Sequence, residues 1–234
     1  MRKGKDLPTT ATPSAGDFLD AYCQLGRKAE SILCITVTSL QSKTFDIALL
    51  SKEMARGAIS DSTIEVIDSR TVAGALGFVV LEAARIASQG AELAQVAKAA
   101  RRVMGRVNFI AMLDTLFYLA RTGRIARAAA WAGSILSMKP IVEHSPSIGE
   151  TTLVARPRTK MRDIERMMKI MAERIGDSRA HVMVHHADAL EEGEKLRAEI
   201  GARFNCAELH LTEFTPAMGI HAGPGLLSVS FYAD

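Results

Sequence analysis

The fold is decided by residues 31–68, which hold three patterned segments: Ser31–Val37 (SILCITV), Lys43–Arg56 (KTFDIALLSKEMAR) and Thr63–Asp68 (TIEVID). The first and third segments are short and rich in β-branched residues, as is typical of buried strands. The middle segment has a helical pattern, and Gly57 ends it. A strand, a helix and a strand at this spacing predict a βαβ unit, which requires a parallel sheet.

The pattern changes on both sides of this unit. Before it, Ser14 and Asp17 form a capping-box-like pair that predicts the start of a helix. After it, Ala-rich helical patterns lead to a strand-like run, Val107–Met112. Beyond Pro140, two strand patterns flank a Ser-Pro-Ser-Ile-Gly turn, as in a hairpin. We therefore predict an α/β fold with two lobes.

The two lobes are expected to differ in architecture and to meet near Gly105. Residues 1–105 are predicted to form an N-terminal α/β lobe with a parallel sheet. Residues 106–234 are predicted to form a C-terminal α+β lobe with a mixed or antiparallel sheet. Within the second lobe, helical patterns over Asp114–Arg121 and Ile125–Met138 surround a Gly break.

The amino-acid composition limits the classes of molecule that the protein is expected to bind. Of 234 residues, 48% are hydrophobic and 24% are charged, which is ordinary for a folded soluble protein. The net charge of +3 is too small to demand a nucleic acid or a membrane. Aromatic residues make up only 5%, so base-stacking surfaces are not expected. The aliphatic side chains suit a core and equally suit the wall of an alkyl-chain pocket.

The cellular compartment follows from the cysteines and the N-terminus. Cys23, Cys34 and Cys206 lie far apart without CxxC spacing, so we expect buried free thiols in a reducing compartment. The N-terminal segment has no apolar signal core, and the apolar runs are too short to span a bilayer. We therefore expect a cytoplasmic protein without stable membrane insertion.

Two polar stretches are candidates for a ligand site. Leu7–Ser14 precedes a helix, and in isolation its hydroxyls are best explained as a solvated cap. Val37–Thr44 joins a buried strand to a helix, and ligands of parallel α/β sheets bind at the carboxyl ends of strands. Hydroxyls and backbone N–H groups there suit an anion. Simple helix capping by Ser42 explains the second stretch equally well.

A third stretch, Met218–Gly225 (MGIHAGPG), places His221 among Gly and Pro residues. This context predicts a tight loop rather than a helix face, and Gly lets the backbone approach a ligand closely. A lone His is normally a surface or core residue, but the Gly-Pro-Gly context favours a functional role.

A fourth stretch, Asp114–Ile125, has the pattern of an amphipathic helix that ends at a Gly cap, where Arg residues are favourable. Arg121 and Arg124 lie beside Gly123 and are also suited to a phosphate or an acidic surface. His185 and His186 are adjacent on a predicted strand, so their rings point to opposite faces and are unsuited to one metal. No metal site or cofactor motif is predicted.

Taken together, these stretches resemble the DegV family of bacterial fatty-acid-binding proteins along essentially the whole chain. Six ordered segments carry the resemblance: Pro8–Ser14 with Asp17-Phe18, Thr38–Thr44 with Ala48, Val66–Ser69, Asp114–Ile125, Lys139–Ile141 and His221–Gly225. The chain departs from the family pattern at Ala11, Thr12, Thr38 and Lys43. The family also usually begins with an earlier strand ending in Asp-Ser-Thr, and this sequence starts after it.

The resemblance implies a carrier of long-chain fatty acids that is not itself an enzyme. It implies that hydroxyls and a histidine hold the carboxylate between the lobes, while the acyl chain lies in an apolar tunnel of the C-terminal lobe, lined from 109–138. It also implies that a separate fatty acid kinase phosphorylates the bound acid and meets Arg121 and Arg124. The expected ligand-binding residues are Thr10, Thr38, Ser39, His221, Ala222 and Gly223.

Two other functions remain open from the sequence. A hydrolase or acyltransferase would use Ser39 or Ser42 with His221, and it needs a Ser–His hydrogen bond and an orienting carboxylate such as Asp68. A nucleic-acid-binding regulator is suggested only by scattered Arg clusters, and its mark is salt-dependent DNA binding. The mild charge and scarce aromatic residues argue against the regulator.

Overall fold

The computed structural model describes residues 8–59, 62–125, 139–145, 147–155 and 160–234. Near its start, strands β1 (Ser31–Thr36) and β2 (Thr63–Asp68) form a two-stranded parallel sheet. Helix α2 (Thr44–Ala55) connects them, which confirms the predicted βαβ unit. Helix α1 (Ala15–Gly26) starts at the predicted capping box. The small core of this unit contains Tyr22, Ile32, Ala55 and Ile64.

Among the described residues, the larger sheet has six strands in the order β5-β4-β3-β8-β6-β7. Only β6 and β7 pair in parallel, and the other neighbours are antiparallel, so the predicted mixed sheet is confirmed. The hairpin predicted after Pro140 is the β4–β5 pair. The strands are β3 (Asn108–Met112), β4 (Ile141–Ser145), β5 (Glu150–Ala155), β6 (Ala180–His186), β7 (Cys206–Glu213) and β8 (Leu227–Ala233).

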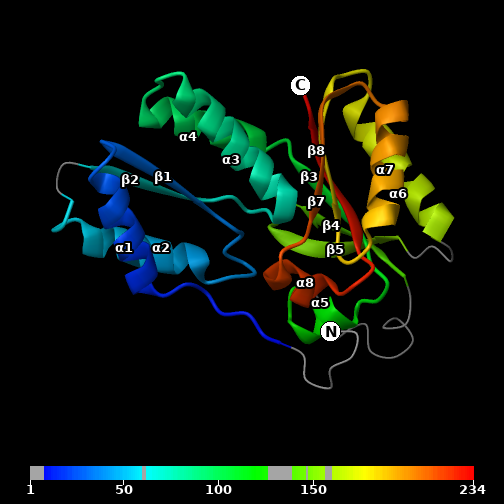
Figure 1. Ribbon diagram of the computed structural model, residues 1–234, viewed down its shortest axis with the longest axis horizontal. Helices are drawn as coiled ribbons and strands as arrows, with labels where there is room; N and C mark the ends of the chain where they lie inside the picture. The colour runs from blue at the N-terminus through cyan, green and yellow to red at the C-terminus, as the bar shows by residue number, and fades with distance from the viewer. Residues whose placement is uncertain (1–7, 60–61, 126–138, 146, 156–159) are drawn as a thin grey trace.

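Helices cover both faces of this large sheet (Figure 1). Side chains alternate along a strand, so Phe109 and Ala111 of β3 face one core while Ile110 and Met112 face the other. Helices α3 (Ala73–Ser88) and α4 (Leu93–Met104) contribute to the first core. Helices α6 (Lys160–Ile175) and α7 (Leu190–Arg203) contribute to the second.

The first core also reaches the small sheet. Leu33, Ile35 and Val37, from β1 and the loop after it, pack against the cluster that contains Phe78 of α3 and Phe109 of β3. Helices α3 and α4 therefore pack against the small sheet as well as the large one. The lobe boundary near residue 105 stays a prediction.

Two local predictions differ from the structure. His221 does not lie on a loop, because Pro216 starts a short helix, α8 (Pro216–Ala222), whose last turn contains it. This helix ends at Gly223, which has a φ of +79°. Helix α5 (Phe117–Arg121) starts later than predicted, because the Thr115 hydroxyl accepts the Phe117 N–H and forms a turn first. The helix predicted over 125–138 lies almost entirely outside the described residues.

The cysteines are free thiols, as predicted. Cys23, Cys34 and Cys206 are each partly rather than fully buried.

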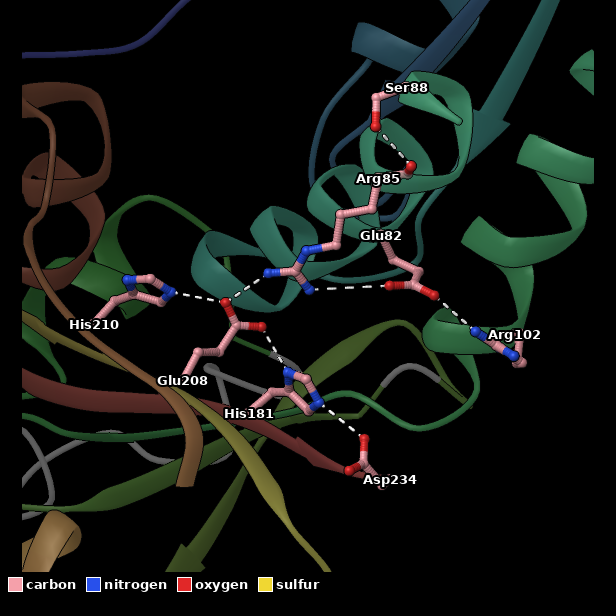
Figure 2. Close-up of polar contacts among 8 residues, drawn as sticks. All are labelled: Glu82, Arg85, Ser88, Arg102, His181, Glu208, His210 and Asp234. Carbon is pink, nitrogen blue, oxygen red and sulfur yellow. Dashed lines mark hydrogen bonds and ion pairs between the residues drawn. The ribbon is translucent and has the colours of Figure 1, made fainter. Parts of the chain in front are cut away.

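A charged network ties the edge strand β7 to α3 (Figure 2). The Glu208 carboxylate accepts from Arg85 at 2.6 Å, lies 2.6 Å from His181 Nδ1 and lies 2.9 Å from His210 Nε2. The other His181 nitrogen lies 2.9 Å from an Asp234 oxygen. Burial raises the pKa of Glu208, but the hydrogen bonds from Arg85, His210 and His181, together with the positive charge of Arg85, outweigh burial and bring the pKa to about 2.

Candidate functional site

A cavity of about 700 Å³ lies where the loops after the small sheet meet the large sheet and α8. Its apolar wall comes from segments far apart in the chain. Phe109, Ala111, Leu113 and Leu119 belong to the region predicted to line a tunnel. The remaining apolar lining residues are Ala11, Val37, Leu40, Val72, Val142, Phe214, Ala217, Met218, Ala222 and Leu226.

The polar lining residues also come from distant segments, and several contact one another. Thr10 Oγ1 lies 3.2 Å from His221 Nε2, although 211 positions separate them in sequence. Gln41 Nε2 donates to Thr151 Oγ1 at 3.0 Å and to the Arg124 carbonyl at 3.1 Å. The polar lining residues are Thr10, Thr12, Ser39, Gln41, Ser42, Lys43, Arg124, Thr151 and His221.

His221 has one ring nitrogen left over. Its Nδ1 atom is buried and has no hydrogen-bond partner among the residues that the structure describes. Burial lowers the pKa of His221, and the positive charge of Arg124 lowers it further, so the ring is neutral at pH 7. A buried nitrogen without a partner is costly.

Thr38 and Ser39 were both predicted to bind a ligand, but they lie in different environments in the structure. The Thr38 hydroxyl donates to the Gly149 carbonyl at 3.2 Å, and Thr38 is fully buried and does not line the cavity. Ser39 lines the cavity, and its backbone N–H donates to Asp68 Oδ1 at 3.2 Å. Of these two residues, Ser39 alone lines the cavity.

The residues after His221 shape the site. Ala222 lines the cavity, whereas Gly223 does not. A Cβ atom at Gly223 would lie only 2.2 Å from the Tyr118 ring of α5. Gly223 thus allows α8 to pack against α5, and this packing holds His221 in place.

The two arginines assigned to a partner lie in different places. Arg121 is exposed at the end of α5. Arg124 lines the cavity, and its guanidinium hydrogen-bonds to the Thr122 carbonyl. Arg124 lies close enough to His221 for its positive charge to lower the pKa of that ring, and its place in the cavity lining was not predicted.

Gln41, Thr151 and Phe214 are among the lining residues that were not predicted to bind a ligand. Gln41 lies inside the polar stretch after β1, so a signal for it was present. Thr151 and Phe214 had none, because only the sheet topology brings β5 and the segment after β7 to this cavity.

The arrangement required of a Ser–His hydrolase is not found among the described residues. His221 Nε2 contacts Thr10 rather than Ser39 or Ser42. Asp68, the candidate orienting carboxylate, instead accepts the backbone N–H groups of Ser39 and Arg70. No group of three or more potential metal ligands lies together in the part of the chain that the structure describes.

The structure is an α/β fold with a cavity that has a largely apolar wall and a set of hydrogen-bonding groups. The chain belongs to the DegV family, since the family model described as "Uncharacterised protein, DegV family" matches residues 1–234. A DegV domain-containing protein of Clostridium acetobutylicum is 30% identical over 98% of this chain and 80% of its own length. A DegV domain-containing protein of Streptomyces coelicolor is 31% identical over 94% of this chain and 77% of its own length.

Solved structures agree with this assignment. DegV of Bacillus subtilis, described as a fatty acid binding protein, is 27% identical with a TM-score of 0.88. A DegV family protein of Thermus thermophilus, described by its fatty acid binding, is 26% identical with a TM-score of 0.88. Each match covers all of this chain and 81% of the other. None of the described helices is long and apolar enough to cross a membrane.

Proposed function

We propose that this protein binds a long-chain fatty acid in the cavity, as its relatives are described to do. The observation that carries the proposal is the cavity lining, in which apolar residues from the large sheet and from the loops after the small sheet accompany His221. Each methylene buried against this wall contributes about 0.8 kcal/mol. A long acyl chain can therefore bind tightly with few polar contacts.

The carboxylate needs donors, because burying an unpaired anion costs several kcal/mol. Thr10, Ser39 and His221 are the proposed donors, and Arg124 supplies a positive charge beside them. In the neutral ring, either nitrogen of His221 can carry the proton.

We further propose that the bound acid is presented to a separate fatty acid kinase in the cytoplasm, with Arg121 at the contact. Arg121 is exposed on α5, which packs against the helix that carries His221. An exposed guanidinium beside the cavity suits an acidic or phosphate-bearing partner surface. In this role the protein is a carrier, and the kinase supplies the catalytic groups.

Mass spectrometry of an organic extract from the purified protein tests the ligand directly. We expect a co-purified long-chain acid and, after delipidation, saturable binding of added acid. The matching methyl ester keeps the tail but loses the anion, so it should bind at least about tenfold more weakly, the scale of one charged hydrogen bond. Equal affinities for acid and ester would place the polar end elsewhere. No lipid and no binding would reject the function.

A further inference from the structure

Strand β7 forms one edge of the large sheet, and no strand among the described residues pairs with its outer side. With eight residues it is the longest of the described strands, and its sequence, CAELHLTE, contains no Lys, Pro or Gly. Every residue of β7 is half-buried or exposed, whereas β8, inside the sheet, is buried over Leu227–Tyr232. Long edge strands without such protective residues pair readily with a further strand.

The backbone groups on the open side of β7 follow from its pairing with β6. This pairing is regular from His181 onward, and at its end the Phe214 N–H donates to the His186 carbonyl at 2.8 Å. Alternate residues of a strand present their N–H and C=O groups to the same neighbour, so the even-numbered residues of β7 bond to β6. The residues whose N–H and C=O groups point outward are Ala207, Leu209 and Leu211.

The two faces of β7 carry different side chains. Leu209 and Leu211 pack against the second core, under α7. Glu208 and His210 lie on the face toward α3, where Glu208 is already neutralised by Arg85 (Figure 2). The His210 side chain is 46% exposed. The open edge therefore presents a carboxylate and an imidazole two positions apart, on either side of Leu209.

We propose that β7 pairs in antiparallel orientation with β7 of a second copy of this chain, with a two-fold axis at Leu209. Such an interface uses the same surface on both copies and closes as a dimer. Leu209 then faces the partner's Leu209 in a hydrogen-bonded pair, and Ala207 faces the partner's Leu211. The interface lies outside the ligand cavity, which no residue of β7 lines.

Charge selects this register over its neighbours. With the axis at Leu209, Glu208 lies opposite the partner's His210 in a non-hydrogen-bonded pair, where Cα atoms are about 4.5 Å apart. Its own His210 is two residues along the strand, at about 6.8 Å. Shifting the axis by one residue would place Glu208 opposite the partner's Glu208, or His210 opposite the partner's His210, and like groups directly opposite are unfavourable.

Sedimentation velocity of the full chain over a wide range of concentrations tests the dimer. We expect the wild type to pass from monomer to dimer as concentration rises. His210→Glu places like charges opposite each other twice in the interface and should raise the dimer Kd at least about tenfold. Lys98→Glu also adds an acidic residue at an exposed position, on α4, and should leave the Kd unchanged.

Cysteine cross-linking tests the register and does not depend on the charge variant. Leu209→Cys should form a reducible covalent dimer under mild oxidation, because its Cα atoms would lie about 5.5 Å apart, within disulfide range. Ala207→Cys is the matched control on the same edge and face, and its Cα atoms would lie more than about 13 Å apart. A wild type that stays monomeric at every concentration would overturn the proposal. So would a dimer unaffected by His210→Glu, or equal cross-linking of the two cysteine variants.

Discussion

At the scale of single residues, His221 is the side chain on which the ligand site depends most. It contacts Thr10 through one nitrogen and leaves the other buried without a described partner. Replacing it with Ala should weaken fatty-acid binding by roughly 1.5–3 kcal/mol, the scale of a hydrogen bond to a charged group. Fluorescence or calorimetric titration measures this change. His210→Ala, at an exposed His on β7, is the control, and equal losses in both variants would contradict the assignment.

A second histidine makes stability depend on pH. His185 is buried between Thr212 Oγ1 at 2.7 Å and Ser230 Oγ at 3.1 Å, and burial lowers its pKa to about 4. In the unfolded chain, the pKa of this histidine is near 6.5. Between about pH 6.5 and pH 4, the unfolded chain therefore binds a proton that the folded chain does not. The free energy of unfolding should therefore fall as pH drops through this window, by on the order of 3 kcal/mol.

Denaturant titrations at several pH values measure this slope. His185→Gln keeps a polar side chain but removes the titrating group, so its slope over the same window should be clearly smaller. Identical slopes in the two proteins would assign the effect to other groups.

Some residues of the cavity lining were predictable from the sequence. They lie in stretches where hydroxyl-bearing residues and Gly are concentrated at the end of a strand or helix. Thr10, Ser39 and His221 were found by this signal, and all three line the cavity. The same signal selected Thr38, one position from Ser39, whose hydroxyl bonds to Gly149 instead. Neighbouring residues at a strand end point in different directions, and polarity alone does not tell which one faces a ligand.

At the scale of elements, the contact between α5 and α8 depends on one glycine. Gly223→Ala would force a Cβ atom to within 2.2 Å of the Tyr118 ring at a φ of +79°. Left-handed backbone strain and the clash should together cost about 2 kcal/mol or more. Thermal unfolding measures the loss. Gly219→Ala in the same helix meets no atom within 4 Å and should be neutral or slightly stabilising. A similar loss in both variants would argue against the clash.

Elements were predictable where a local pattern was long and regular. The βαβ unit over residues 31–68 and the hairpin after Pro140 have clear periodicity and turn signals, and both are confirmed. Helix α8 was missed because its seven residues include Gly219, and Gly is a poor helix former. Pro216 at its first turn was the available signal.

At the scale of the whole molecule, the cavity lies where the loops after the small sheet meet the large sheet and α8. Leu33 of the small sheet and Phe109 of the large one belong to the same core. Periodicity predicted the parallel and mixed sheets separately, but their shared packing depends on contacts between distant segments. Thr151 and Phe214 joined the site for this reason, and no local pattern indicates such contacts.

Because the cavity joins both sheets, a bound ligand should stabilise them together. A saturating long-chain acid at about 100 times its Kd should add about 2.7 kcal/mol to the free energy of unfolding. We expect a higher melting temperature and slower hydrogen exchange in both β1 and β3. That result would mean that one ligand contacts the proposed donors Thr10 and His221 as well as the apolar residues Val37 and Phe109. Hydrogen exchange with mass spectrometry, with and without the acid, distinguishes joint from local stabilisation. Slower exchange in β3 alone would mean that the ligand does not contact the small sheet.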